Sequence, residues 1–381
     1  MEVIFHRQWI SVGMECDVPE PGDVLAVDIG RSSIIIARGD DRTLRGFFNV
    51  CRHRGARILA AGQGVVGKLV CPYHQWTYEL TGELIHAPHM GKSQNAHCYG
   101  LLPVHVRAIG GLIFACLADE PPTDIDDVAA ALEPRLAPYG LADAKVAWQS
   151  DIVEKGNWKL TMENNRECYH CAANHPELCL SFVDLDFGYD PDSLSAEDRK
   201  LAATHATVYA RQTEAWEQAG HPSAPIDRVV GHETHFRTQR LIIAGDGESQ
   251  TLDGRPACRK RLGRISDRSL GDTHLWGNNS WNHFMNDHAV TFMVFPLSAE
   301  ETLVRTKWLV HREAVEGVDY DLDHLTSVWQ ATNAQDAHLV GLAHAGAAGH
   351  GYRPGPYSPF SEEHVDRFAT WYVERMQAHG Y

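Results

Sequence analysis

Two short segments of the chain each offer one cysteine and one histidine to a metal. They are Cys51-Arg52-His53 and, after 17 intervening residues, Cys71-Pro72-Tyr73-His74. Two thiolates and two imidazoles suit a [2Fe–2S] cluster in which histidines replace the cysteines on one iron, a replacement that raises the reduction potential. A structural zinc site is the alternative, although zinc loops usually pair like ligands. We therefore expect a cluster held by Cys51, His53, Cys71 and His74.

A glycine pattern lies between these segments, at Gly62-Gln63-Gly64-Val65-Val66-Gly67. It matches the phosphate-binding fingerprint of dinucleotide domains, which requires a helix to begin at the glycines. A run typical of a strand, residues 68–71, follows instead. We therefore expect these glycines to form a hairpin and not a nucleotide site.

A second set of candidate ligands surrounds His170 and His175. Five residues of regular helix rotate by about 140°, so both rings reach one ion only where a helix ends or is distorted between them. Asn174 and Pro176 favour such an end. Glu167 precedes His170 by three residues, and we expect its carboxylate to hydrogen-bond that imidazole.

Two histidines leave room for a carboxylate, because a 2-His-1-carboxylate triad holds iron(II) on one face and leaves the other face open to O₂. The candidate is Asp336, in a long helix predicted to begin after Tyr320. An unpaired carboxylate centred on an apolar stripe is costly, and by the helical period the stripe around Asp336 consists of Leu322, Leu325, Trp329, Thr332, Leu339, Val340 and Ala343. A buried ion pair with an arginine, or a helix end, is the alternative to metal ligation.

The nine cysteines are odd in number and irregularly spaced, which favours a reducing compartment over a disulfide framework. Cys168 and Cys171 form a C-x₂-C pair without a second such pair. We expect both to be buried thiols.

The 381 residues are enough for two or three domains. An acidic, proline-bearing stretch at 118–124 predicts a boundary between a domain over 1–118 and a domain over 119–381. The first is expected to be antiparallel β and the second to mix helices with an antiparallel sheet, which makes the fold class α+β. The expected elements are strands over 25–29 and 33–37, a turn at 39–42, helices over 151–179 and 207–219, strands over 288–295 and 302–311, and a helix from 321 past 342.

The 34 basic and 50 acidic residues give a formal charge of −16, which argues against a nucleic-acid partner. No apolar run approaches the ~18 residues of a membrane helix, and the first residues lack a signal-peptide core. We expect a cytoplasmic protein without a membrane partner.

Together, the two constellations resemble the α-subunit of the Rieske non-haem iron oxygenases. The cysteine–histidine segments match the Rieske signature. Asn157-Trp158-Lys159, Glu163-Asn164 and Glu167-x₂-His170-x₄-His175-Pro176 match the family's iron-site segment. The resemblance covers nearly the whole chain. It implies a Rieske [2Fe–2S] domain over 1–118 and a helix-grip-like catalytic domain with mononuclear Fe(II), held by His170, His175 and Asp336, over 119–381.

Within that family, the C-terminal half is similar to the branch that acts on quaternary ammonium compounds. The residues that carry this similarity are Trp281-Asn282-His283-Phe284, residues 287–292, Lys307-Trp308-Leu309-Val310-His311, residues 331–336, residues 352–358 and Trp371-Tyr372. The resemblance implies a monooxygenase that uses O₂ and two electrons to hydroxylate an N-methyl group, which is then lost as formaldehyde. Proline betaine (stachydrine) is the favoured substrate, with glycine betaine, choline and carnitine as alternatives. A Rieske electron carrier is the non-enzymatic alternative.

The resemblance also implies a separate NAD(P)H-dependent reductase and a homotrimer in which Glu167 bridges His74 of one chain and His170 of the next. A quaternary ammonium group has no N–H to donate, so aromatic faces are expected to bind it. The candidates near the expected pocket are Tyr169, Trp276, Trp281, Phe284 and Phe292.

Overall fold

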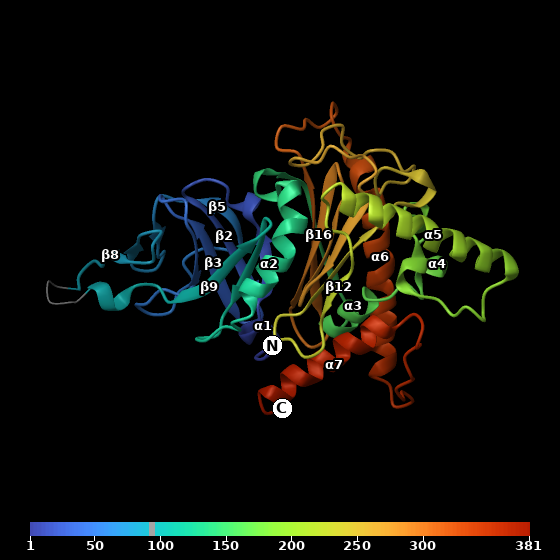
Figure 1. The fold of residues 1–381 in the computed structure, drawn as a ribbon. Coiled ribbons are helices and arrows are strands. Elements are labelled where there is room, and N and C mark those ends of the chain that lie inside the picture. The colour runs from blue at the N-terminus through green and yellow to red at the C-terminus, as the bar shows by residue number, and fades with distance from the viewer. Residues whose placement is uncertain (91–95) are drawn as a thin grey trace.

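The computed structural model describes residues 1–90 and 96–381, and its N-terminal part is built on a seven-stranded antiparallel sheet (Figure 1). The strand order is β1-β10-β9-β4-β3-β2-β5. Helix α1 (Ile4–Arg7) precedes the sheet, whose strands are β1 (Ile10–Met14), β2 (Asp23–Ile29), β3 (Ser32–Arg38), β4 (Leu44–Phe48), β5 (Gly62–Val65), β9 (Pro103–Ile109) and β10 (Leu112–Cys116).

Strands β2 and β3 are buried on both faces, which explains their nearly continuous apolar sequences. Successive side chains point to opposite faces, and here the two faces contribute to different cores. Ile34 and Ile36 join the core shared with the second sheet, whereas Ile35 joins a smaller core under the cysteine–histidine loops. The expected strands and the turn after Arg38 are confirmed.

The glycine pattern at 62–67 begins with strand β5, and the run over 68–71, which is typical of a strand, contains a short strand at Leu69–Val70. The expected hairpin is wrong, because β5 pairs with β2 and not with the strand that follows it. A small three-stranded sheet follows instead, formed by β6 (Leu69–Val70), β7 (Thr77–Tyr78) and β8 (Leu84–His86).

The C-terminal part is built on a second seven-stranded antiparallel sheet, in the order β11-β17-β16-β15-β14-β13-β12. Its strands are β11 (Lys145–Glu154), β12 (Ile226–Arg228), β13 (Phe236–Leu241), β14 (Asp272–Trp276), β15 (Ser280–Phe284), β16 (His288–Pro296) and β17 (Thr302–Val310). The strands expected over 288–295 and 302–311 are therefore confirmed. The helices are α2 (Ile125–Leu136), α3 (Trp158–Asn164), α4 (Cys171–Asn174), α5 (Ala196–Gln218), α6 (Leu322–Ala347) and α7 (Glu363–Ala378).

The helix expected over 151–179 is wrong. Residues 151–154 complete β11, which pairs with β17 along its whole length, so long-range pairing overrides the local helical pattern. The remainder breaks into α3 and α4, with a turn between them. The helix expected over 207–219 is the C-terminal half of the longer α5.

The second sheet separates two layers, with α2 on one side and α6 on the other (Figure 1). Alternate residues of β16 explain this arrangement. Val290 and Phe292 enter the core shared with the helices α3, α6 and α7, whereas Ala289 enters the core shared with α2. The α+β class, with an antiparallel β domain followed by a domain in which helices cover an antiparallel sheet, is confirmed.

Two buried polar contacts join the N-terminal and C-terminal parts of the chain. Lys307 on β17 donates to both carboxylate oxygens of Asp17, at 2.7 and 2.6 Å, and both side chains are almost fully buried. Asn279 pairs with both backbone groups of Ser11. The two parts of the chain therefore form one packed body.

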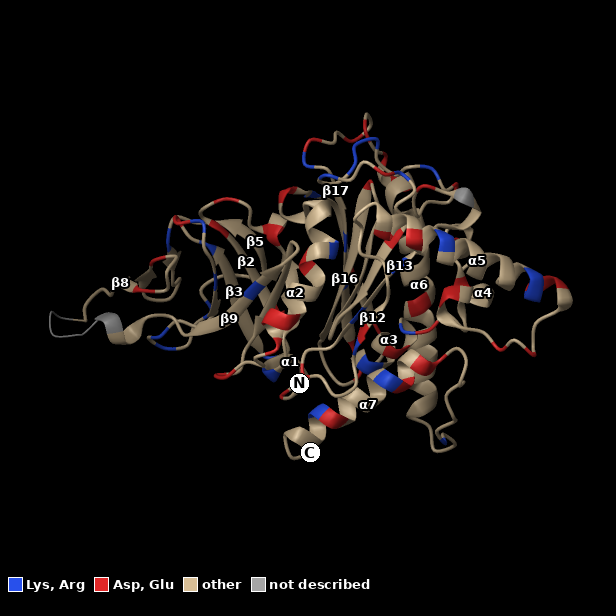
Figure 2. Ribbon diagram, viewed as in Figure 1, with Lys and Arg blue, Asp and Glu red and all other residues tan. Residues whose placement is uncertain are grey.

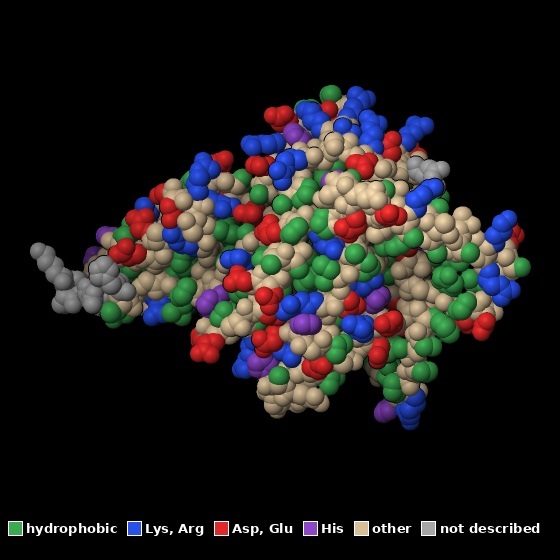
Figure 3. Space-filling model, viewed as in Figure 1, with side chains coloured by type: hydrophobic (Ala, Val, Ile, Leu, Met, Phe, Trp, Pro, Cys, Tyr) green, Lys and Arg blue, Asp and Glu red, His purple; other side chains and the backbone are tan. Residues whose placement is uncertain are grey.

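Within residues 1–90 and 96–381, no helix combines the length and hydropathy needed to cross a bilayer. Acidic and basic residues occur in both the N-terminal and the C-terminal part of the chain (Figure 2). Side chains of both signs alternate over the face shown in Figure 3, so the net charge of −16 is not gathered into a single patch on that face.

Candidate metal centres and active-site cavity

The two cysteine–histidine loops are built in the same way. In each loop, the N–H four residues after the cysteine donates to the cysteine carbonyl, from Gly55 to Cys51 and from Gln75 to Cys71, both at 3.0 Å. Gly55 and Gln75 have φ values of 76° and 59°, in the left-handed region where glycine is unstrained. Each loop therefore reverses direction directly after its histidine.

This backbone geometry brings all four candidate ligands together. Cys51 and Cys71 are free, buried thiols, 2% and 1% exposed. The Nδ1 atoms of His53 and His74 lie 3.2 Å apart in the partly exposed half of the site. Two inner sulfurs and two outer imidazoles fit a binuclear cluster with thiolates on one iron and imidazoles on the other.

Neighbouring rings orient the two imidazoles. His53 stacks on Trp76, with centroids 4.9 Å apart and planes 6° apart, and His74 stacks on Tyr73 at 3.8 Å. Tyr73 is 56% exposed, and the guanidinium of Arg54 lies over its ring. The imidazole side of this centre therefore faces solvent.

The second centre is built around a break between helices. Helix α3 starts at the N-cap Asn157 and ends at Asn164, and the single-turn helix α4 lies between His170 and His175. His175 has φ −122° and ψ 65°, outside the helical region. The helix end that joint ligation requires is thus present, although Glu167 lies in the preceding turn and not on the same helix as His170.

His170, His175 and Asp336 converge on one point. The Nε2 atoms of His170 and His175 lie 3.4 and 3.1 Å from Oδ1 of Asp336. That oxygen is buried and accepts no hydrogen bond from the described part of the chain. Burial opposes ionisation of Asp336, but the two imidazoles outweigh it and hold the pKa of this carboxyl below its usual value. Two ring nitrogens and one carboxylate oxygen around a common point fit a mononuclear iron(II) site.

The outward nitrogens of the two rings are already occupied. His170 Nδ1 donates to Glu167 Oε1 at 2.6 Å, and His175 Nδ1 donates to Gln335 Oε1 at 2.8 Å. Gln335 is held in turn by Glu177, at 2.8 Å. These contacts leave Nε2 of each ring as the atom available to a metal.

The prediction that Cys168 and Cys171 are free thiols is wrong. The turn between α3 and α4 brings their Cα atoms to 4.9 Å and the sulfurs form a disulfide. The sulfur of Cys171 also lies within 4.8 Å of ligand atoms of His170 and His175. Because it is bonded to Cys168, it is not available as a thiolate ligand.

A cavity opens beside the convergence point. It is lined by the two histidines, Asp336 and Glu167, and further by Asn164, Asn165, Cys168, Cys171, Leu178, Phe182, Phe187, His274, His283, Trp329 and Thr332. Its aromatic and imidazole walls come from three places: the turns after α4, the paired strands β14 and β15, and helix α6.

The aromatic residues proposed from the sequence are not among the residues that line this cavity. Tyr169 is 72% exposed, and Phe284 belongs to the core on the other face of the sheet. Trp276 packs behind His274 and Phe187. Phe292 packs behind His283 and Trp329. Trp281 stacks on Phe292.

Sequence reasoning did not propose the four rings of Phe182, Phe187, His274 and His283. Trp329 was present only as a member of the apolar stripe around Asp336. The period of α6 provided a signal for Trp329, and the alternation of β15 provided one for His283. Phe182 and Phe187 lie in and beside short turns that follow α4 and have no such periodicity.

Two family models match this chain. The Rieske [2Fe–2S] domain matches residues 8–105, and the catalytic domain of the ring-hydroxylating α-subunit matches residues 141–378. The glycine betaine monooxygenase oxygenase subunit of Chromohalobacter salexigens is 46% identical over 99% of this chain and 82% of its own length. The corresponding subunit of Pseudomonas aeruginosa is 44% identical over 99% of this chain and 85% of its own length.

Solved structures share the fold. The quaternary ammonium Rieske monooxygenase CntA in complex with L-carnitine has a TM-score of 0.69 and 21% identity, over 98% of this chain and 90% of that chain. Naphthalene 1,2-dioxygenase with indole bound has a TM-score of 0.66 and 22% identity, over 98% and 88%. The two domains and their matches lead to one conclusion: this chain belongs to the α-subunits of the Rieske non-haem iron oxygenases, whose cofactors are a [2Fe–2S] cluster and a mononuclear iron.

Proposed function

We propose that the chain is the oxygenase component of a monooxygenase that removes one N-methyl group from glycine betaine. The observation that carries this proposal is the identity of 46% and 44% to glycine betaine monooxygenase subunits along 99% of the chain. O₂, two electrons and two protons would convert the methyl group to a hydroxymethyl group and yield one water. The resulting carbinolamine loses formaldehyde and a proton and leaves dimethylglycine.

In this proposal the ligands divide between the two centres. Cys51, Cys71, His53 and His74 hold the cluster, and His170, His175 and Asp336 hold the mononuclear iron. The cluster supplies single electrons, received from a separate reductase, and the iron supplies the activation of O₂. The chain itself orients the ligand rings through Glu167 and Gln335, and the cavity beside them would hold the substrate between aromatic and polar side chains.

The cavity suits a compact cation. Phe182, Phe187 and Trp329 offer aromatic faces, to which a trimethylammonium group is attracted by the ring quadrupole. Trp329 is fixed by a hydrogen bond from its Nε1 to Gln250, at 3.1 Å. Proline betaine, the substrate favoured by the sequence motifs, carries a bulkier ring around its nitrogen and becomes the second candidate after glycine betaine.

Electron transfer is proposed to occur between chains in a head-to-tail homotrimer. The small sheet next to the cluster loops and the helices α4 and α6 lie at opposite ends of the chain, with both large sheets between them (Figure 1). A second cavity reaches Glu167 and His170 from the outer side, next to Glu163 and Tyr357. We assign this opening to the His74 side of a neighbouring chain, with Glu167 as the bridge.

Formaldehyde release tests the proposal. The holoenzyme, a Rieske reductase and NADH are to be incubated with glycine betaine, proline betaine, carnitine and choline, and formaldehyde and the amine product are quantified. We expect release from glycine betaine that requires O₂ and the reductase. Protein that contains both iron centres and releases formaldehyde from none of the four compounds would overturn the proposal.

Asp336→Asn tests whether Asp336 is a ligand of the mononuclear iron. It removes one charge from the iron site, so we expect loss of the mononuclear iron and at least about a 100-fold loss of turnover, with an unchanged cluster spectrum. Asp323→Asn is the matched control, because Asp323 is an exposed residue of the same helix. Full turnover by Asp336→Asn would exclude Asp336 as a ligand.

A further inference from the structure

Two buried histidines face each other on adjacent strands at the cavity wall. His274 on β14 and His283 on β15 are direct cross-strand partners, with ring centroids 4.7 Å apart. Each is only 2% exposed, and both line the cavity beside the iron site. Neither belongs to the candidate iron ligands.

Both rings have a nitrogen without a protein partner. Nδ1 of His283 lies 2.6 Å from Oδ2 of Asp272, whereas its Nε2 finds no partner within residues 1–90 and 96–381. Nδ1 of His274 is also unpaired among the described residues. Buried polar atoms are rarely left unpaired, because they lose their hydrogen bonds to water without replacement. A ligand in the cavity is the natural partner for them.

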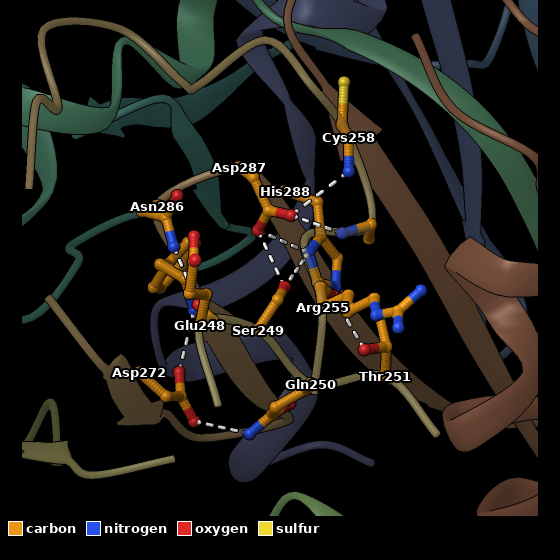
Figure 4. A network of polar contacts seen from close by, with 12 residues as sticks. Glu248, Ser249, Gln250, Thr251, Arg255, Cys258, Asp272, Asn286, Asp287 and His288 are labelled. Carbon is orange, nitrogen blue, oxygen red and sulfur yellow. Dashed lines mark hydrogen bonds and ion pairs between the residues drawn. The ribbon is translucent and has the colours of Figure 1, made fainter. Parts of the chain in front are cut away.

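Asp272 fixes the orientation of the His283 ring. It is fully buried, lies 2.6 Å from Nδ1 of His283 through Oδ2, and accepts a hydrogen bond from the backbone N–H of Phe284. Its further hydrogen bond from Gln250 is shown in Figure 4. The contact with Nδ1 places Nε2 on the side of the ring away from Asp272.

The same network positions the aromatic wall. Gln250 donates to Asp272 and accepts from Nε1 of Trp329, so the rings of His283 and Trp329, 4.5 Å apart, share one support. A bound trimethylammonium group and a bound anion would thus be held by one rigid frame.

The two carboxylates of the cavity wall, Glu167 and Asp336, lie at the iron end. The guanidinium of Arg237 lies 5.1 Å from the ring of Trp276, which packs on His274. Burial first, and then the positive field of neighbouring groups that include Arg237, lowers the pKa of His274 well below its usual value. Glu167 and Asp336 would repel the carboxylate of a betaine, so that group is expected at the imidazole end of the cavity.

We propose that His283, assisted by His274, binds the carboxylate of the substrate and so selects betaines over quaternary ammonium compounds without a carboxylate. This inference rests on the proposed function and names its substrate determinant.

The test compares glycine betaine with tetramethylammonium, which keeps the cation and lacks the carboxylate. Binding of each to the holoenzyme is measured by calorimetry for the wild type and for His283→Asn. The Asn amide occupies the position of Nδ1, so it keeps the contact with Asp272 and removes only the Nε2 donor. We expect the affinity for glycine betaine to fall about tenfold or more, and that for tetramethylammonium to change by less than about threefold.

His288→Asn is the matched control. His288 is also fully buried, its Nε2 is likewise unpaired in the described chain, and its Nδ1 contacts Asp287 and Ser249 (Figure 4). His288 does not line the cavity. The ratio of the affinities for glycine betaine and tetramethylammonium in His288→Asn should therefore equal the ratio in the wild type. If His283→Asn does not fold, His274→Asn is used in its place, with a loss in the same direction.

The result that overturns the inference is an unchanged ratio of the two affinities in His283→Asn and His274→Asn, or a wild type that binds both compounds equally. Failure of the proposed function is seen separately, because a wild type that prefers glycine betaine and releases no formaldehyde contradicts only the reaction.

Discussion

At the scale of single residues, the iron site depends on which nitrogen of each histidine is free. The contacts of Glu167 with His170 and of Gln335 with His175 occupy Nδ1 and leave Nε2 for the metal. Partners of this kind fix the ring orientation, and their loss typically costs 10–100-fold in metal affinity or activity. The two rings differ in their support, since one partner is a carboxylate and the other a neutral amide.

Gln335→Leu tests the role of the neutral amide that holds the ring of His175. The substitution removes the acceptor of the His175 Nδ1 proton and frees Glu177, so we expect iron affinity to fall about tenfold while the cluster is retained. Iron content after dialysis against a graded chelator measures this change. Gln330→Leu, at an exposed position of the same helix, is the control. Equal iron retention in both variants would contradict a role for Gln335 in holding His175.

At the scale of secondary structure elements, strand β11 approaches the iron helix with a buried carboxyl group at its end. Glu154 is 4% exposed and accepts a hydrogen bond from Thr161 of α3 at 2.5 Å. Burial, with a smaller contribution from the negative charge of Asp336, raises the pKa of Glu154 to about 7. The carboxyl is therefore mostly protonated in the folded protein below neutral pH.

Glu154→Gln is expected to change how stability depends on pH. The pKa of Glu154 is higher in the folded state than its ordinary value of 4.5. Its contribution to the free energy of unfolding is therefore fully present below about pH 4.5 and is lost as the pH rises through 7. The amide of Glu154→Gln does not ionise, so the variant does not undergo this loss of stability. At pH 8 the variant should exceed the wild type in unfolding free energy by on the order of 2 kcal/mol, and the difference should shrink towards pH 5. Urea unfolding at both pH values measures it; parallel pH profiles would contradict the raised pKa.

At the scale of the whole molecule, one chain separates its two centres by the two packed sheets, which the Asp17–Lys307 pair helps to join (Figure 1). That rigid separation makes the oligomer part of the proposed mechanism. In a head-to-tail ring, each interface joins the cluster of one chain to the iron of the next.

Mixed oligomers test this arrangement. Cys51→Ser removes the cluster and His170→Ala the iron, so each variant alone should be inactive. When the two are co-expressed and mix at random, about a quarter of the interfaces combine an intact cluster with an intact iron site, and formaldehyde release should recover to about that fraction. The separately purified variants mixed without subunit exchange are the control. No recovery in verified mixed oligomers would show that electrons do not cross between chains.

The sequence by itself determined the candidate ligand types of both proposed centres. Cys51, His53, Cys71 and His74 lie in two short loops, and the geometry of each loop is local, since each turn closes on its own cysteine carbonyl. Only the approach of the two loops to each other is tertiary. Asp336 became a candidate because a carboxylate on an apolar helical stripe has a physical cost that the period of one helix reveals. Ligand spacing and helical period are properties of adjacent residues, so no tertiary information was needed for them.

The tertiary structure alone decided the cavity beside the candidate iron site. Its walls combine turn residues such as Phe182 with His274 and His283, which face each other only because β14 and β15 pair in one register. The same long-range pairing made residues 151–154 a strand, and the turn between α3 and α4 brought Cys168 and Cys171 into bonding distance. Cross-strand register and the packing of separate turns depend on contacts between residues far apart in the chain, and local patterns do not contain them.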